Sequence, residues 1–429
     1  MYISLTNSPV SKNRKKKDAD GAPRGVRTVS STVITLGIVS MLTDISSESV
    51  SAILPLYITG FLGMSTIAYG VLDGLYQGTS AVVRIAGGYA SDRLDQPKWV
   101  AFVGYGLAAV ARIGLLLWSG FAALTAVITA DRIGKGIRTA PRDAMITATS
   151  NPEHLAGSFG VHRMLDNIGA AIGPFLAFLI LLIVPDGFSI VFAASLAFAG
   201  IGVLILGLVV PNVRTRRREG SAKTKINWRV VASERMRRVL AAAGVLGLVT
   251  IGDGFVYLVL QARSDFAALW FPLLYVGTNV AFLLFAIPLG RLADRVGRAR
   301  VFVWAHVGLL ASYVIAVLPL ADVAATILCL VFLGAFYAGT DGVLSALTAQ
   351  LTTTETRGTA IATAQTVVAL TRFVSAAGFG VLWYAVGREP AMVIVAIVLA
   401  VAIPLVLVLM RPLLRGERDA MDAAKVEAP

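Results

Sequence analysis

Residues 290–300 read GRLADRVGRAR, and residues 88–98 read GYASDRLDQPK. Both stretches begin with the pattern G-x-x-x-D-R, and the second copy starts 202 residues after the first. The glycine of this pattern lets two helices approach closely, and the aspartate can cap a neighbouring helix N-terminus. The arginine can pair with an acid on an adjacent helix. We therefore expect a charged turn that occurs twice, once in each half of a duplicated chain.

The composition of the chain is that of a membrane protein. Of its 429 residues, 56% are hydrophobic and 15% are charged, whereas about a quarter of the residues of a soluble domain are charged. Apolar runs of about 20 residues are long enough to cross a bilayer as helices. The fold class that we expect is all-α and integral to the membrane, with twelve transmembrane helices in two pseudo-symmetric six-helix halves. The helices are predicted at residues 31–58, 66–90, 99–118, 121–145, 158–183, 188–210, 238–261, 266–289, 301–319, 322–349, 358–386 and 390–410.

Polar and basic segments divide the chain. The first 30 residues include SKNRKKK and PRGVR without an apolar run, which is not the pattern of a secretory signal peptide. A second long basic stretch lies near the midpoint. The segments that we expect are a basic cytoplasmic tail at 1–30, an N-terminal six-helix half at 31–210, a basic cytoplasmic linker at 211–237, a C-terminal six-helix half at 238–411 and a cytoplasmic tail at 412–429.

Lysine and arginine are distributed unevenly over the loops. If both termini are cytoplasmic, the cytoplasmic segments contain 28 of the 38 Lys and Arg, and the outer loops contain only Arg263 and Arg388. This distribution follows the positive-inside rule. The formal charge of +13 is then explained by tracts that face the anionic inner surface of the membrane. We therefore expect both termini in the cytoplasm and no nucleic-acid partner.

The two turns resemble the loop signature G-x-x-x-D-R-x-G-R-R of the major facilitator superfamily. The second copy is nearly complete, whereas the first has Asp95 and Gln96 where Gly and Arg are usual. The resemblance extends over 31–411 and implies a transporter of the bacterial cytoplasmic membrane, with its site between the two halves. It also implies that the turns act as conformational latches, with Asp143 as a candidate partner of Arg93. The expected latch residues are Gly88, Asp92, Arg93, Asp143, Gly290, Asp294, Arg295 and Arg298.

Two further patterns lie in the fourth and fifth spans. Residues 132–140 read RIGKGIRTA and are similar to the family's pattern R-x-x-x-G-x-x-x-A. Residues 169–174 read GAAIGP and are similar to the pattern G-x-x-x-G-P, which is found especially in the family's antiporters; the trailing Gly-Gly of that pattern is Ala-Phe here, at 177–178. Ordinary small-residue packing with a proline kink is the alternative interpretation. The residues expected to serve packing and the kink are Gly169, Gly173 and Pro174.

Sixteen charged residues fall inside the predicted spans, besides Arg238 and Asp322 at the first positions of two of them. A charged side chain near a helix centre costs about 3 kcal/mol, so these residues must face the bundle interior, pair together or lie near the cytoplasmic ends. Eight acids match eight bases, and thirteen of the sixteen lie in the N-terminal half, where we expect ion or proton coupling. The acids are Asp44, Glu48, Asp73, Asp131, Asp143, Asp166, Asp253 and Asp341, and the bases are Arg84, Arg112, Arg132, Lys135, Arg138, Arg142, Arg163 and Arg372.

Asp44 and Glu48 are the most informative of these charges. They stand at i and i+4 in the first helix, on one face, about 6 Å apart and about midway through the membrane. Two like charges in low-dielectric surroundings favour a proton on one of them. The pair is therefore a candidate proton carrier or substrate contact. The alternative is that Arg132 or Lys135 neutralises the pair structurally.

Other candidates lie in the fourth, fifth and seventh spans. Asp131 and Lys135 belong to a charged stripe on one face of the fourth helix, and Arg132 matches the arginine of the family pattern. The fifth helix contributes a histidine that can titrate near neutral pH. Asp253 occupies a place in the seventh helix comparable to that of Asp44 in the first. The expected proton-coupling or substrate residues are Asp44, Glu48, Asp73, Asp131, Arg132, Lys135, His162, Asp166 and Asp253.

These features favour a secondary active transporter that moves a small molecule by alternating access, with proton-coupled efflux as the leading prediction. Two alternatives stay open. One is proton-coupled uptake of a small anionic metabolite, with the bases of the fourth helix as its receptor. The other is a membrane sensor of the same fold that does not transport. The expected partners are a small-molecule substrate, protons and the lipid bilayer, and we expect a monomer.

The sequence argues against an enzyme. It contains no G-x-x-x-x-G-K-[ST] phosphate-binding loop. Cys329 is the single cysteine, and His154 and His306 stand apart from other possible metal ligands. We therefore expect no catalytic activity, no cofactor and no metal site.

Overall fold

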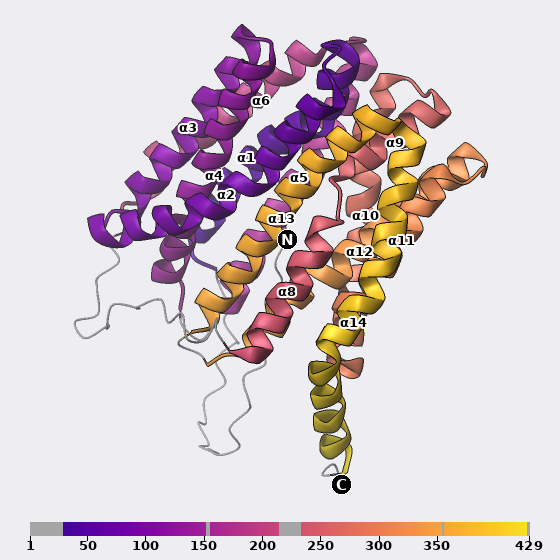
Figure 1. Ribbon diagram of the computed structural model, residues 1–429. Coiled ribbons are helices and arrows are strands. Elements are labelled where there is room, and N and C mark those ends of the chain that lie inside the picture. The colour runs from indigo at the N-terminus through magenta and orange to yellow at the C-terminus, as the bar shows by residue number, and fades with distance from the viewer. Residues whose placement is uncertain (1–28, 152–154, 214–232, 354–355, 427–429) are drawn as a thin grey trace, which may run out of the picture.

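The structure, a computed structural model, describes residues 29–151, 155–213, 233–353 and 356–426, with the side chains of 81–82, 85–94, 156 and 419–426 also outside its description. Every regular element in the described ranges is a helix, and Figure 1 shows the helices running roughly alongside one another. The elements of the N-terminal half are α1 (Ser31–Leu56), η1 (Tyr57–Phe61), α2 (Thr66–Leu94), α3 (Pro97–Leu117), α4 (Phe121–Thr149), α5 (Leu155–Ile183) and α6 (Phe188–Leu208). Those of the C-terminal half are α8 (Glu234–Leu248), α9 (Asp253–Ser264), η3 (Ala268–Trp270), α10 (Phe271–Val296), α11 (Arg298–Val317), α12 (Asp322–Gln350), α13 (Arg357–Val386) and α14 (Arg388–Val426).

The helices account for twelve membrane crossings. Ten segments of the described chain are long and apolar enough to span a bilayer, and α8 and α9 together form one of them. The remaining two crossings are α2 and α4, which are 29 residues long and pack against each other. Their polar and charged residues lower their hydropathy, because these two helices face other helices rather than lipid. The predicted all-α membrane fold with two six-helix halves is confirmed.

The seventh crossing is broken, so the prediction of one continuous helix over 238–261 was wrong. α8 ends at Leu248, and α9 begins at Asp253 after an extended Gly252. The Tyr313 hydroxyl of α11 accepts a hydrogen bond from the backbone N–H of Ile251 at 2.9 Å. This contact satisfies one of the backbone groups that the break leaves without a helical partner. A broken helix at membrane depth is tolerated where it lines a cavity.

The last helix is longer than predicted. α14 continues to Val426 rather than ending near 410. The residues after 412 include many good helix formers, and Figure 1 shows this extension projecting beyond the other helices. Its Glu417 accepts hydrogen bonds at 3.2 Å from the backbone N–H of Ala299. The extension is therefore fixed to the first turn of α11.

The two halves meet mainly where α2 packs against α13 and α5 against α10. Gly70 allows a close approach, because an added Cβ would lie 2.5 Å from the Ala376 carbonyl oxygen and 3.1 Å from the Cα of Gly380. The Thr66 hydroxyl donates to the Gly380 carbonyl at 3.0 Å. On the other side, the rings of Phe178 and Trp270 lie 5.5 Å apart. These contacts lie toward the end of the bundle that holds η1 and η3.

The two repeated turns share one backbone feature. Asp95 in the first turn has φ 50°, and Gly297 at the matching position of the second has φ 105°. Aspartate is among the residues that tolerate the left-handed region best. The departure of the first copy from the glycine of the signature therefore preserves the turn.

Candidate functional site

Two adjacent cavities lie between α2 of the N-terminal half and the helices of the C-terminal half. They have volumes of about 240 Å³ and about 230 Å³. Gln77, Asp341 and Arg372 line both cavities, so the two share a wall. We call the first the acidic chamber, defined by Glu48, Asp73, Asp253, Tyr337, Asp341 and Arg372. We call the second the basic chamber, defined by Arg84, His306, Phe336, Asp341, Gln365 and Arg372.

The acidic chamber brings together carboxyl groups from four helices. Glu48 comes from α1, Asp73 from α2, Asp253 from α9 and Asp341 from α12. Asp253 accepts a hydrogen bond from the Tyr337 hydroxyl at 2.6 Å. Four carboxyl groups face one guanidinium here, so the chamber favours a positively charged occupant or bound protons.

Asp73 reaches the break in the seventh crossing. Its carboxyl carbon would lie 3.0 Å from a Cβ added to Gly252, so only glycine fits between the two helices. The Oδ2 atom of Asp73 is buried without a hydrogen-bond partner. It therefore lies beside the N-terminus of α9, where the helix dipole favours negative charge.

Aromatic side chains form another wall of the acidic chamber. The rings of Tyr257 and Tyr275 lie 4.6 Å apart in an edge-to-face arrangement. The Tyr257 hydroxyl shares a hydrogen bond of 2.6 Å with the Thr278 hydroxyl. Aromatic faces of this kind attract cations.

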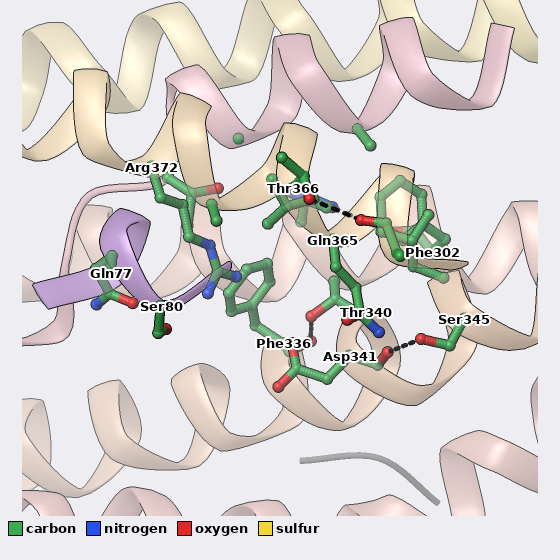
Figure 2. Close-up of a pocket in the computed structure, with 18 of the residues that line it drawn as sticks. Gln77, Ser80, Phe302, Phe336, Thr340, Asp341, Ser345, Gln365, Thr366 and Arg372 are labelled. Atoms are coloured by element: carbon green, nitrogen blue, oxygen red, sulfur yellow. Dashed lines mark hydrogen bonds between the residues drawn. The ribbon is translucent and has the colours of Figure 1, made fainter. Parts of the chain in front are cut away.

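The basic chamber has the opposite character. Arg84 of α2 donates to the Gln365 side chain of α13 at 3.1 Å. Figure 2 shows Arg372 reaching from α13 toward Phe336, with Gln77 and Ser80 of α2 beside it. The guanidinium carbon of Arg372 lies 5.9 Å from the Phe336 ring centroid and 5.5 Å from that of Tyr337.

A buried ion network fills the N-terminal half around Asp131. Arg112 of α3 lies 2.8 Å from one Asp131 oxygen, and Arg132 pairs with the other. Arg112 also donates to the Ser46 hydroxyl of α1 at 3.3 Å. The Arg132 guanidinium carbon lies 3.7 Å from the centroid of the Tyr76 ring. Asp131 is thus held by two bases inside one half.

The same network continues around Asp44 and Asp166. Arg138 lies 3.8 Å from Asp44, and Arg142 lies 4.0 Å from Asp166. The side chains of Asp44 and Asp166 are within hydrogen-bonding reach of each other. Asp44 and Asp166 therefore belong to one buried cluster of acids and bases. Lys135 is close enough to Asp44 to interact with it electrostatically.

The predicted site residues fall into two groups. Glu48, Asp73 and Asp253 line the acidic chamber. The others lie in the N-terminal half, apart from the lining of both chambers: Asp44, Asp131, Arg132, Lys135, His162 and Asp166. Asp44 and Glu48 share a helix, but Asp44 contacts the ion network and Glu48 faces the chamber.

Several chamber residues were missing from the predicted site. Asp341 and Arg372 line both chambers, and Arg84 lines the basic one. All three were recognised as charges inside spans, which is the signal that could have selected them. Gln365 stands out in the sequence as a polar residue in an apolar helix, whereas no pattern in the sequence distinguishes Tyr337.

The predicted latch residues are only partly described. The side chains of Gly88, Asp92 and Arg93 lie outside the described residues, so the pairing of Arg93 with Asp143 stays a prediction. In the second turn Asp294 pairs with Arg298 at 3.0 Å. Arg298 also donates to the Ala346 carbonyl of α12 at 3.2 Å. Both contacts lie within the C-terminal half.

The predicted packing residues lie between α5 and α1. Cβ atoms added to Gly169 and Gly173 would come within 3.0 Å of the α1 backbone, at Met41 and Ser49. Pro174 lies inside α5 directly after this contact. Across the described side chains, no three His, Cys, Asp or Glu residues are grouped as a metal site would require.

The twelve crossings and the cavity between two halves define a polytopic membrane transporter. The family model of the Major Facilitator Superfamily matches residues 36–278 and 264–427. The chain belongs to this superfamily.

Relatives and solved structures agree with this assignment. An uncharacterized MFS-type transporter of Methanocaldococcus jannaschii is 30% identical over 370 residues, which cover 83% of this chain and 89% of that protein. A mutant of the nucleoside transporter NupG superimposes with a TM-score of 0.77 at 15% identity, over 88% of this chain and 99% of that one. A POT family transporter in complex with 5-aminolevulinic acid gives a TM-score of 0.74 at 14% identity, over 89% and 96%. At these identities the two structures show a shared fold alone.

Proposed function

We propose that the chain exports a small polar compound with a positively charged group, in exchange for protons. The acidic chamber carries this proposal. Its four carboxyl groups surround a single guanidinium at the boundary between the halves, where transporters of this fold bind their substrates. The excess negative charge must be neutralised, because uncompensated buried charge is costly.

Either protons or a cation can neutralise these carboxyl groups. A bound ammonium group replaces protons, and protons replace the ammonium group after its release. Burial favours the neutral form of a carboxyl, so empty carboxyls take up protons readily. An exchange of this kind is antiport. Alternating access follows if the two halves change orientation only when the chamber holds either protons or the substrate.

Glu48 connects the chamber with the rest of the N-terminal half. It lines the chamber one helical turn from Asp44, and it interacts electrostatically with Lys135. Asp44 lies 3.8 Å from Arg138, and Asp166 lies 4.0 Å from Arg142, farther from the chamber. We infer that these carboxyl groups hold the transported proton while the substrate occupies the chamber.

Uptake of an anionic metabolite is less well supported. The arginines of the fourth helix lie within 4.0 Å of acids: Arg132 of Asp131, Arg138 of Asp44 and Arg142 of Asp143. None of them lines either chamber. Their charge is therefore neutralised within the N-terminal half.

The proposed export is tested with purified protein in proteoliposomes that contain a pH-sensitive dye. With an acidic lumen, addition of a transported amine outside should release protons from the vesicles faster than in protein-free vesicles, and Asp253→Asn should slow this release. Glu389→Gln, at an exposed pair with Arg388, is the matched control and should leave it unchanged. Amine uptake without proton release would contradict antiport.

We also propose that the chain is a monomer of the bacterial cytoplasmic membrane with both termini in the cytoplasm. A topology reporter fused after Pro429 or inserted near Gly220 should read cytoplasmic. One inserted at Asp186, in the turn between α5 and α6, should read external. An external reading near Gly220 would overturn the proposed orientation.

A further inference from the structure

We infer that the transported compound is a zwitterion, with its positive group in the acidic chamber and its negative group in the basic chamber. This inference rests on the proposed function for the assignment of the two chambers as the transport site. It goes further by giving the basic chamber a role. A ligand with an amine alone would leave the basic chamber without a charged group to bind.

The chambers are continuous through their shared wall. Gln77 of α2, Asp341 of α12 and Arg372 of α13 contribute to both. These three side chains come from both halves of the chain. One small molecule can therefore extend from one chamber to the other past this wall, and it would contact both halves at once.

The charges are divided between the chambers. Among the described side chains, the acidic chamber contains Glu48, Asp73 and Asp253 besides the shared Asp341 and Arg372, and no other base. The described lining of the basic chamber adds Arg84 and the buried His306, and no other acid. The division gives the combined site one negative end and one positive end, which matches a ligand with two opposite charges.

Arg372 provides the strongest argument for an anionic group. No ion pair within 4.0 Å among the described side chains involves Arg372. Its Nε atom is buried without a hydrogen-bond partner, and its nearest described neighbours include the faces of two aromatic rings. A guanidinium offers five donors in a fork that fits a carboxylate or phosphate. A bound anion would satisfy the Nε donor, which the protein leaves without a partner.

Arg84 extends this anion site. Arg84 is oriented by its hydrogen bond to Gln365. Other polar groups in the lining already use their donors: Nδ1 of His306 donates to the Phe302 carbonyl at 2.9 Å, and the Thr366 hydroxyl donates to the Ala362 carbonyl at 2.8 Å. The arginines are therefore the groups that can bind an anion here. The negative group of the ligand would thus lie between Arg84 and Arg372.

The test compares zwitterions with analogues that lack one charge. The probes are a series of straight-chain amino acids from glycine to 6-aminohexanoate, each beside the amine and the carboxylic acid of the same length. Binding is measured as the rise in melting temperature of the purified protein in detergent over a concentration series. At least one zwitterion should bind about tenfold more tightly than its two analogues, the effect of one charge-assisted interaction. Equal binding of zwitterion and amine, or no binding by any probe at millimolar concentration, overturns the inference.

Three variants then assign the charges. Arg372→Gln should remove the advantage of the zwitterion over the amine, and Arg372→Lys should restore part of it. Asp253→Asn should remove its advantage over the acid. Arg388→Gln serves as a control away from both chambers. An unchanged preference in Arg372→Gln, with a normal melting temperature, would also overturn the inference.

These measurements separate the inference from the proposed function. They use no proton gradient and report equilibrium binding alone. If a zwitterion binds as expected but moves without protons, antiport fails and the substrate class stands. If protons are exchanged for simple amines that bind as well as zwitterions, antiport stands and the substrate class fails.

Discussion

The two halves of the molecule use their buried charges differently. In the N-terminal half, Asp131 is held by Arg112 at 2.8 Å and by Arg132, all within that half. In the C-terminal half, Arg372 lies against aromatic rings beside a cavity, with no carboxylate within 4.0 Å among the described side chains. Pseudo-symmetric halves have thus diverged in charge chemistry while retaining the same helical frame.

This difference assigns the paired charges to the stability of the fold and the charges that face a cavity to binding. Charges that are paired inside one half keep that half intact whether or not a ligand is present. Charges that face a cavity are available to a ligand and to protons. Glu48 lies on the boundary, because it belongs to α1 but lines the acidic chamber.

The largest expected effect concerns Glu48 and Asp44. The double variant Asp44→Asn, Glu48→Gln should retain downhill exchange of substrate and lose accumulation driven by a pH gradient, because it cannot hold the transported proton. Accumulation and exchange are measured in the same proteoliposomes. Accumulation at the level of the unaltered protein would move the coupling site to Asp131, His162 or Asp166. Loss of binding would instead make the pair a substrate contact.

The next effect tests the paired charges of the N-terminal half. Arg112→Met leaves Asp131 with one base fewer in a buried site, and removal of one partner of a buried pair costs about 3–5 kcal/mol. We expect a large fall in melting temperature and poor recovery of folded protein. Arg388→Gln, at an exposed pair, should change the free energy of unfolding by less than about 1 kcal/mol. Equal stability of the two variants would contradict the contrast between the halves.

The contact between the halves gives a smaller effect. A Cβ at Gly70 would lie 2.5 Å from the Ala376 carbonyl oxygen of α13, whereas a Cβ at Gly378, also on α13, would have no atom within 4 Å. Gly70→Ala should therefore cost about 1–3 kcal/mol through overpacking, and Gly378→Ala should cost far less. The strain separates α2 from α13, so cysteine labelling of Asn279→Cys from the η1 end should accelerate in Gly70→Ala alone. Unchanged labelling would mean that this contact does not close that end.

The sequence predicted the frame of the fold well and the contacts of the site less well. Apolar runs and charged turns mark crossings directly, because lipid permits few alternatives to a helix. The break at 249–252 was missed because Tyr313, which is distant in sequence, holds it. Likewise, the partner of Asp131 is Arg112, which depends on close packing of α3 on α4 at Gly104 and Gly134.

The candidate site shows the same limit. Charges inside spans were recognised without exception, since each is conspicuous in an apolar helix. Their grouping was not predictable, because the rotation of each helix about its axis decides which charge faces the cavity. Asp44 and Glu48 illustrate this, as they share a predicted face but contact different surroundings.

The smallest effect comes from the two repeated turns, which the halves secure in different ways. In the second turn the N–H of Ala299 donates to Glu417 of α14 at 3.2 Å. The matching residue of the first turn is Pro97, which has no N–H to donate, and the next residue, Lys98, donates from its side chain to the Gly207 carbonyl of α6 at 2.9 Å.

Glu417→Gln should therefore weaken the start of α11, because an anionic cap near a helix N-terminus contributes about 0.3–1 kcal/mol. Amide hydrogen exchange at Ala299 should accelerate, while exchange in α3 stays unchanged. Lys98→Met should produce the opposite pattern: amide hydrogen exchange should accelerate at the end of α6 and stay unchanged at the start of α11. If both variants loosened both turns, the turns would be coupled through the whole molecule rather than secured separately within each half. If neither did, these contacts would add nothing measurable to the helix ends that they join.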